Sequence, residues 1–367
     1  MQRVVAQASI FCLAIVAIFY YQISFAQSQI FVTETNCAQI GVWEGGTCTL
    51  TNDVLVPLTI QQAGVTLDGN GYSITAPAGL NEATLSLMGA NITIKNLTLE
   101  STAENAIRIT AAAPNAVVED VIINNPTTGL KISGSGAVIR DVFVVGGAST
   151  VFGFQVESTN TIDINRVQIS NSRFGVATFN SSDIVITESR FTNSDTGVLI
   201  DISQNVTLEQ LEIENSSEYG VSITGQSSAV IKNNQISGEA SQNLSPSAGI
   251  SIGNARITTD TVISNNDISG WGVAIVDETT YDFGGPIQVS FIPFMKSMWD
   301  MLVPTVWAQV SPKIVITENN FIMNSFAYSI PIMASETIAL DQNGIGNYWD
   351  SYDQASEGCI DANNDQV

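Results

Sequence analysis

The sequence predicts an all-β protein, a right-handed parallel β-helix of about eleven coils, and three features of its pattern indicate this fold. A short apolar-x-apolar-x-polar-x-x-apolar segment recurs about every 22–24 residues. An alternating segment that opens with glycine lies between successive copies, and Asn or Gly follows most copies at one fixed position. Strands at this spacing, with no helix between them, stack as coils that pair about 4.8 Å apart.

The first segment sets the repeat. Residues 92–99 (ITIKNLTL) and 162–169 (IDINRVQI) are two of its copies. Alternation with period two is typical of a β-strand in which every second side chain faces the core. We call the last apolar residue of each copy the marker. The expected markers are Tyr72, Leu99, Ile123, Val144, Ile169, Phe191, Ile213, Ile236, Ile268, Phe321 and Ile345.

The second segment supplies another strand in each coil. It begins with glycine and continues with alternating apolar residues, as at Gly129 (GLKI), Gly153 (GFQV) and Gly220 (GVSI). Its copies are expected to pair with one another from coil to coil. A leucine-rich repeat has a similar period, but the Leu/Asn consensus of that repeat is missing.

The position two residues past the marker predicts a sharp turn in each coil. Asn and Gly interchange there, and these residues tolerate a left-handed backbone most readily. Stacked Asn side chains at this position are also expected to hydrogen-bond from coil to coil. The turn residues are Asn125, Gly146, Asn171, Asn193, Asn215, Gly238, Gly270 and Asn347, with Ser101 and Met323 as exceptions.

A polar position three residues before the marker has two interpretations. It is an exposed turn, which we favour, or a ladder of side chains that lines a sugar groove. Its residues are Asn96, Asp120, Asp141, Arg166, Glu188, Gln210, Asn233, Asn265, Glu318 and Gln342.

The N-terminus predicts export. Arg3 precedes an apolar run at 9–21, and residues 24–26 (SFA) form a small-x-small cleavage pattern, so residues 1–26 are expected to be a signal peptide. The alternative is an uncleaved anchor, because the run is near the short limit for a membrane span. No later stretch is long and apolar enough to cross a membrane. The protein is therefore expected outside the cytoplasm, whether secreted, at the cell surface or periplasmic.

The rest of the chain divides by pattern. Residues 27–60 are expected to cap the open strand edges of the first coil. The β-helix follows at 61–350, with an insertion at 281–313 that is expected to pack across the rod as a short amphipathic helix. A contact with a partner or a membrane surface is the alternative for this insertion. Residues 351–367 form an acidic C-terminal segment that ends within a loop and is expected to be incomplete.

Three cysteines remain after removal of a signal peptide. Cys37 and Cys48 are expected to pair in an oxidising compartment. Closing so short a loop contributes about 2–3 kcal/mol in the chain-entropy model. Cys359 has no identified partner.

The charge balance restricts the possible partners. The chain has 12 Lys and Arg against 35 Asp and Glu, which gives a formal net charge of −23 at pH 7. A surface this negative repels phosphates, so neither nucleic acid nor anionic lipid is an expected partner. It also disfavours an acidic polysaccharide, unless Ca²⁺ bridges the two.

Two motifs resemble a known family. Residues 65–74 (VTLDGNGYSI) and 346–350 (GNYWD) are similar to the opening coil and the closing motif of NosD-like right-handed β-helix proteins. The resemblance covers about residues 60–367 and is specific for the fold. It implies periplasmic copper handling as one function. The wider group of similar repeats includes carbohydrate-binding proteins and polysaccharide-cleaving enzymes.

The C-terminal segment holds a candidate calcium loop. Asp361, Asn363 and Asp365 form a D-x-N-x-D pattern, and alternating oxygen ligands suit Ca²⁺. Gln366 stands where such loops have glycine, and the chain ends before a closing carboxylate. The alternative interpretation is a solvated acidic tail.

The insertion holds a weaker candidate for copper. Met295, Met298 and Met301 are spaced so that their thioethers can bind Cu(I). The chain contains no histidine, which is the commonest copper ligand. Methionine at this spacing also lies along one side of a helix, and packing is the favoured interpretation.

No catalytic set is recognisable in the sequence. A glycoside hydrolase needs two carboxylates that face each other across the sugar bond, and coils can bring such a pair together without a motif. The sequence therefore predicts a non-catalytic binding or scaffold protein whose ligand is a polysaccharide or cell-surface glycan. The alternatives are a copper-handling accessory protein and a polysaccharide lyase or hydrolase.

Overall fold

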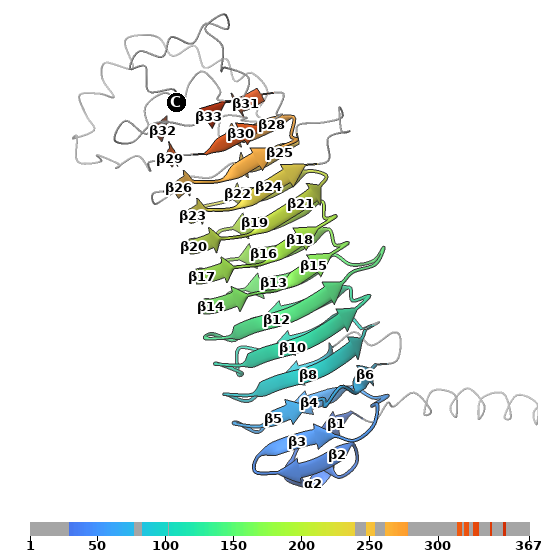
Figure 1. Cartoon of the computed structure of the whole chain (residues 1–367). Helices are drawn as coiled ribbons and strands as arrows, with labels where there is room; N and C mark the ends of the chain where they lie inside the picture. The colour runs from blue at the N-terminus through green and yellow to red at the C-terminus, as the bar shows by residue number, and fades with distance from the viewer. Residues whose placement is uncertain are drawn as a thin grey trace, which may run out of the picture.

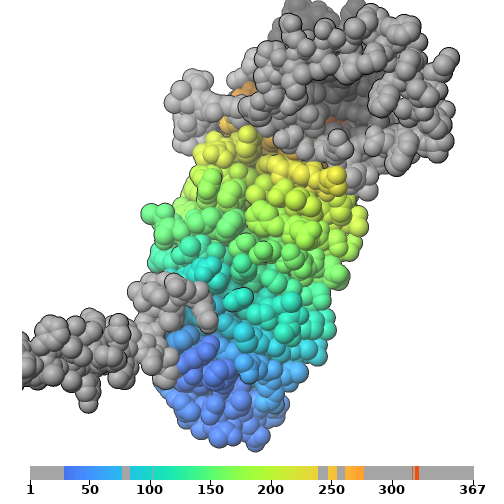
Figure 2. Space-filling view, turned by 180° about the vertical axis from the view of Figure 1, so that it is seen from behind, coloured from blue at the N-terminus to red at the C-terminus, as the bar shows by residue number. Residues whose placement is uncertain are grey.

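The computed structural model describes residues 29–76, 83–101, 103–238, 247–253 and 261–277, and short stretches at 314–317, 319–322, 326–329, 338–339 and 348–349. Over these residues the chain forms an all-β parallel solenoid, the right-handed β-helix that the sequence predicts. Figure 1 shows the coils stacked along one axis from the blue N-terminal end to the orange strands, and Figure 2 shows the same order from behind. Position in the sequence therefore corresponds to position along a rod.

One parallel sheet, sheet A, takes one strand from each coil. Most of its strands are the glycine-containing segments predicted from the sequence. In spatial order its strands are β1 (Ile30–Phe31), β4 (Leu58–Ile60), β7 (Ala83–Leu87), β9 (Asn105–Ile109), β11 (Thr128–Ile132), β13 (Phe152–Glu157), β16 (Phe174–Phe179), β19 (Thr196–Asp201), β22 (Tyr219–Thr224), β25 (Ala248–Ile252), β28 (Val273–Asp277) and β31 (Phe326–Ser329).

The marker segments form the second strand system, sheet B. In three coils each segment is one strand, namely β8 (Thr93–Glu100), β10 (Val117–Asn124) and β12 (Val138–Val145). The next segment is split, and β12 pairs with both halves, β14 (Asn160–Asn165) and β15 (Gln168–Ser170). The first half continues as β17 (Ser182–Thr187), β20 (Gln204–Glu209), β23 (Ala229–Lys232), β26 (Thr261–Ser264), β29 (Ile314–Thr317) and β32 (Ile338–Ala339). The second half continues as β18 (Arg190–Thr192), β21 (Glu212–Ser216), β24 (Gln235–Gly238), β27 (Asp267–Ser269), β30 (Asn320–Ile322) and β33 (Tyr348–Trp349).

A residue with a left-handed backbone stands where each marker segment bends or splits. Asn96 has φ 53° within β8, and Arg166 has φ 51° between β14 and β15. This is the polar position three residues before the marker, so the turn interpretation is correct for its described members. Those members, all with positive φ, are Asn96, Asp120, Asp141, Arg166, Glu188, Gln210, Asn233 and Asn265. Glu318 and Gln342 lie outside the described residues.

The predicted turn two residues past the marker is left-handed at asparagine but not at every glycine. Positive φ occurs at Asn125, Asn171, Asn193, Asn215 and Gly270. Gly146 and Gly238 do not have positive φ, so the prediction is wrong there. A Cβ at Gly146 would lie 2.1 Å from the Asn171 carbonyl oxygen. Glycine is therefore required there because the next coil leaves no room for a side chain, and not because the backbone is left-handed. Asn347 lies outside the described residues.

The strand register shows that the first and last predicted markers, Tyr72 and Ile345, do not occupy marker positions. Ile74, two residues past Tyr72, occupies the marker position of its coil. Trp349, four residues past Ile345, pairs with Phe321. Between β4 and β28 the described strands complete about nine turns, slightly fewer than the eleven predicted for the whole repeat. The insertions between later copies make coil counting from sequence intervals unreliable.

The glycines of sheet A allow the coil to close tightly on its core. A Cβ at Gly153 would lie 2.4 Å from Cγ2 of Ile169 and 2.5 Å from the carbonyl oxygen of Gly175. The same position one sheet-A strand on, Gly175, meets the carbonyl oxygen of Gly197 at 2.4 Å. A side chain at this position collides both with the marker of its own coil and with the next strand. Glycine is therefore required in consecutive coils.

Buried asparagines link the later coils internally. The Asn234 side-chain amide donates to Oδ1 of Asn266 at 2.9 Å, and that of Asn266 donates to Oδ1 of Asn319 at 2.9 Å. The backbone N–H of Asn234 also donates to Asn266 Oδ1, at 3.1 Å. These side chains lie inside the coil where earlier coils carry Val167 and Leu211. Each amide meets its hydrogen-bonding requirement within the core.

The N-terminal end is closed by a small non-repeating unit. Helix α2 (Glu34–Cys37) is capped by Thr33, whose side chain accepts from the Asn36 N–H. Strands β2 (Gly41–Glu44) and β3 (Thr47–Leu50) pair antiparallel, and β3 then pairs parallel with β5 (Thr66–Asp68). The adjacent short strand β6 (Ser73–Thr75) pairs with β8. The first parallel edge of sheet B is therefore covered by a hairpin.

Candidate functional site

Two columns of side chains run along the outer face of sheet B. They are the residues one before and one after each buried marker, and strand register places each beside its counterpart in the next coil. The column before the marker reads Ile122, Phe143, Gln168, Arg190 and Glu212. The column after it reads Asn124, Val145, Ser170, Thr192 and Glu214.

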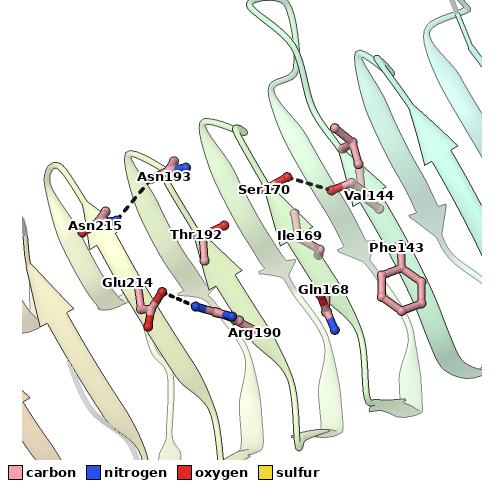
Figure 3. A pocket seen from close by; sticks show the side chains of 11 residues that line it. Phe143, Val144, Gln168, Ile169, Ser170, Arg190, Thr192, Asn193, Glu214 and Asn215 are labelled. Carbon is pink, nitrogen blue, oxygen red and sulfur yellow. Dashed lines mark hydrogen bonds and ion pairs between the residues drawn. The ribbon is translucent and has the colours of Figure 1, made fainter.

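These columns line a shallow groove between β12 and β21, which we call the sheet B groove. It consists of two adjoining depressions of about 400 Å³ and about 710 Å³. Phe143, Gln168 and Arg190 line both depressions, so the groove is continuous across these coils. In Figure 3 Phe143 lies at one end, beyond Gln168, while Arg190 and Glu214 lie toward the other.

Arg190 is held between two carboxylates of the next coil. Its Nη2 lies 2.6 Å from Oε2 of Glu214, and its Nε lies 3.2 Å from Oε2 of Glu212. Both glutamates project outward from β21 because they are two residues apart on one strand. The pairs are partly exposed, so they orient the guanidinium more than they stabilise the fold.

The two glutamates differ in acidity. Partial burial, together with the hydrogen bond and negative charge of Glu214, raises the pKa of Glu212 despite the nearby Arg190. The hydrogen bond from Arg190 lowers the pKa of Glu214. On acidification Glu212 therefore takes up a proton before Glu214 does.

A second arginine, one coil earlier, is held by a single carboxylate of the preceding coil. Arg166 donates from Nε to Oδ1 of Asp141 at 2.8 Å and from Nη2 to Oδ2 at 2.7 Å. This hydrogen-bonded arginine lowers the pKa of Asp141. The groove thus contains two arginines, both paired, and four carboxylates, those of Asp141, Glu188, Glu212 and Glu214. Its net charge is −2, so it repels anionic groups.

The end of the groove near β10 and β12 is apolar. The Phe143 side chain is 40% exposed, beside the exposed Ile122 and Val145. Exposed apolar side chains grouped beside polar ones mark interaction surfaces more often than isolated ones do. The flat Phe143 ring next to the Gln168 amide combines a stacking surface with a hydrogen-bonding group.

The sequence predicts that turn asparagines stack from coil to coil, and in the structure these stacked asparagines border the groove. The Asn215 side-chain amide donates to Oδ1 of Asn193 at 3.4 Å, and that of Asn193 donates to Oδ1 of Asn171 at 3.4 Å. Figure 3 shows the Asn193–Asn215 contact. Asn193 and Asn215 line the groove, so the turn residues also shape its edge.

The polar column forms the turns that the sequence favoured, and its interpretation as the lining of a sugar groove stays a prediction. Four of its left-handed residues also line the sheet B groove. These are Asp141, Arg166, Glu188 and Gln210. Sequence reasoning missed Phe143, Gln168, Glu212 and Glu214 as site residues. They could have been found from their positions next to the markers, where the side chains change from apolar in the earlier coils to polar and charged in the later ones.

The Cys37–Cys48 pair predicted from the sequence forms a disulfide bond in the structure, with Cα atoms 5.8 Å apart. The calcium candidates Asp361, Asn363 and Asp365 lie outside the described residues. The copper candidates Met295, Met298 and Met301 do as well, so both metal sites stay predictions. Within the described part of the chain, no three His, Cys, Asp or Glu side chains cluster as metal ligands. No helix in that part has the length and apolar character of a membrane span.

Comparison with known proteins supports the fold. No curated protein matches this sequence. A family model described as "Right handed beta helix region" matches residues 146–285, which include much of the sheet B groove. The NosD-like assignment stays a prediction, because this match is to the broader fold.

Two solved structures are similar over most of this chain. One is the A-module of the mannuronan C-5 epimerase AlgE6 from Azotobacter vinelandii, with 12% identity, 89% of this chain and 92% of that chain covered, and a TM-score of 0.56. Another is the catalytic domain of a GH87 alpha-1,3-glucanase in complex with tetrasaccharides, with 10% identity, 88% and 69% covered, and a TM-score of 0.55. At these identities the likeness shows a shared β-helix fold.

Proposed function

We propose that this protein binds a neutral polysaccharide outside the cytoplasm, along the sheet B groove. The observation that carries the proposal is the continuous groove itself, with an exposed Phe143 ring beside amide and hydroxyl side chains in register. A pyranose has apolar faces and a polar rim, so it fits a ring flanked by hydrogen-bonding groups.

The charges of the groove favour a neutral ligand. Its two arginines are already paired with carboxylates, and the remaining charge is negative. Uronate or sulfate groups would meet repulsion from Glu188 and Glu212. The expected export of the chain agrees with a glycan ligand, as do a mannuronan epimerase and an alpha-1,3-glucanase among the solved structures with this fold.

The proposal is tested by affinity electrophoresis in gels that contain neutral glucans, xylan or mannan. We expect retardation by at least one of these and about fivefold weaker binding for Phe143→Ala, since a lost stacking contact is worth about 1 kcal/mol. Val185→Ala is the matched control, because Val185 is 39% exposed on the same sheet and lines neither depression. Equal effects of the two variants, or no retardation by any neutral glycan, would contradict the proposal.

A second candidate function is glycan cleavage, favoured by the carboxyl groups of Glu212 and Glu214, which project from β21 into the groove and whose pKa values shift in opposite directions. Two carboxyl groups that differ in acidity can divide acid and base roles. The same gels, assayed for new reducing ends, separate the two functions. Depolymerisation that Glu212→Gln abolishes, with an unchanged Tm, would identify an enzyme. Retardation without cleavage supports the binding function.

A further inference from the structure

Arg108 differs from every other lysine and arginine in the described part of the chain. The others each lie within 3.9 Å of a carboxylate; they are Lys95, Lys131, Arg140, Arg166, Arg173, Arg190 and Lys232. Arg108 is exposed on β9 and has no ion pair among the described residues. Carboxylates outnumber cations about three to one in this chain, so an arginine with no carboxylate partner among the described residues is unexpected.

A second cation stands directly beside Arg108. Lys131 on β11 is its register partner, so the two positive residues occupy neighbouring strands of sheet A about 4.8 Å apart. Like charges placed this way destabilise a sheet. Glu157 lies 3.1 Å from Lys131 and compensates that one charge, which leaves the cluster with a net charge of +1.

An aromatic cluster adjoins these charges, because Phe179 is the register partner of Glu157, the carboxylate that pairs with Lys131. The Phe152 and Phe174 rings are stacked with centroids 5.3 Å apart, and the Phe179 ring meets Phe152 edge-on at 6.0 Å. All three side chains are only partly buried, although they belong to a sheet whose inward residues are fully covered. The Arg173 guanidinium lies 5.2 Å from the Phe174 centroid.

Strand register places the cations and the rings on four consecutive strands of sheet A, β9, β11, β13 and β16. Lys131 pairs with Gln155 on β13, the strand that also carries Phe152. Arg108 lies two strands from β13, about 10 Å along the axis. We call Arg108, Lys131, Gln155, Phe152, Phe174 and Phe179 the sheet A strip.

We propose that the sheet A strip binds a glycan that carries carboxylate groups, that is, one that contains uronic acid. A carboxylate fits the planar guanidinium of Arg108 in a two-point contact, with Lys131 as a second donor. The partly exposed ring cluster then offers apolar contact to a neighbouring sugar. This site lies on a different sheet from the sheet B groove and selects the opposite charge, so it is independent of the proposed function.

The high negative charge of the whole chain does not prevent this binding. Charges further than about 8 Å from a ligand group are largely screened at physiological ionic strength. Within this range the ligand carboxylate meets Arg108, Lys131 and Glu157, whose net charge is +1, so the local field is attractive. Calcium bridging, which the overall charge of −23 otherwise requires for an acidic glycan, is not needed at this site.

The test is affinity electrophoresis of the full chain in polygalacturonate, with its fully methyl-esterified form as the uncharged counterpart and EDTA present throughout. We expect polygalacturonate to retard the protein and the ester to retard it at least tenfold less. Arg108→Gln should weaken binding at least tenfold, because it removes the two-point, charge-assisted contact with the ligand carboxylate. Arg140→Gln is the matched control, because it removes the same charge from a paired arginine on sheet B.

Each outcome decides the inference. Loss of binding in Arg108→Gln alone, with the Tm unchanged, supports the site. Equal losses in Arg108→Gln and Arg140→Gln, equal retardation by the ester, or no retardation of the parent protein overturns it. Phe143→Ala separates the two sites, because it should leave polygalacturonate binding unchanged. Neutral-glycan binding without polygalacturonate binding would leave the proposed function standing and remove this inference.

Discussion

Gln210 has a left-handed backbone, with φ 56°, at the bend of a marker segment. For a residue other than Gly, Asn or Asp this conformation costs roughly 1 kcal/mol. The coil fixes it nonetheless, as the neighbouring Glu188 shows by donating its N–H to the Glu209 carbonyl at 3.2 Å. Several residues of this column therefore carry backbone strain that inter-coil hydrogen bonds offset.

We expect Gln210→Asn to stabilise the protein by roughly 0.5–1 kcal/mol, because asparagine tolerates the left-handed conformation better. Thermal or urea unfolding of the full chain measures the change. Gln168→Asn is the control, since Gln168 lies in the extended strand β15, where asparagine has no advantage. A stabilisation of equal size in both variants would show that relief of the left-handed backbone conformation is not the cause.

At the level of residues, the sequence predicted a left-handed backbone at the asparagine column, but only a turn of unspecified hand at the polar column. Asn171 and Asn193 revealed the first, because asparagine is a recognised residue for this conformation. The second column contains Arg166 and Glu188, which have no such preference. Tertiary contacts impose the conformation there, and local residue type does not report it.

The stacking of the sheet A strands explains why glycine recurs at their start. The sequence predicted that glycine opens these strands, but the reason appears only when coils are stacked. At Gly153 both the marker side chain of the same coil and the next strand occupy the space of a Cβ. Neither contact is visible in the sequence, because Ile169 and Gly175 lie 16 and 22 residues away.

We expect Gly153→Ala to destabilise the protein by about 1–3 kcal/mol, because the added methyl group overpacks the core. Gly272→Ala is the control, since its Cβ would come no closer than 3.3 Å to its neighbours. Comparison of urea midpoints at constant m-value measures both effects. A cost at Gly272 as large as that at Gly153 would argue for a general loss of glycine flexibility.

The molecule as a whole is a stack in which each coil contacts only its neighbours. For this reason the fold followed from periodicity, whereas the sites did not. Phe143 and Glu214 line one groove but lie in different coils, and no local motif connects them. Likewise Arg108 is part of a candidate site only because strand register places Lys131 of the next coil beside it.

The N-terminal unit is expected to protect the first coils only. Replacing both Cys37 and Cys48 by serine should weaken this unit by about 2–3 kcal/mol, the loop-closure contribution of the disulfide. Hydrogen exchange should accelerate at β3 and β5, while the strands of the sheet B groove keep their protection. Faster exchange at β18 and β21 would instead indicate that the rod unfolds as one unit.

The register of sheet B also determines how the length of the groove can change. Phe143 and Arg190 are two coils apart, so about 10 Å of groove separates them. Gain or loss of one complete coil between them would lengthen or shorten that interval by about 4.8 Å and leave both side chains facing outward. Related proteins that evolve by duplication or deletion of coils would thus differ in the length of ligand they accommodate by fixed increments, with the chemistry at either end preserved.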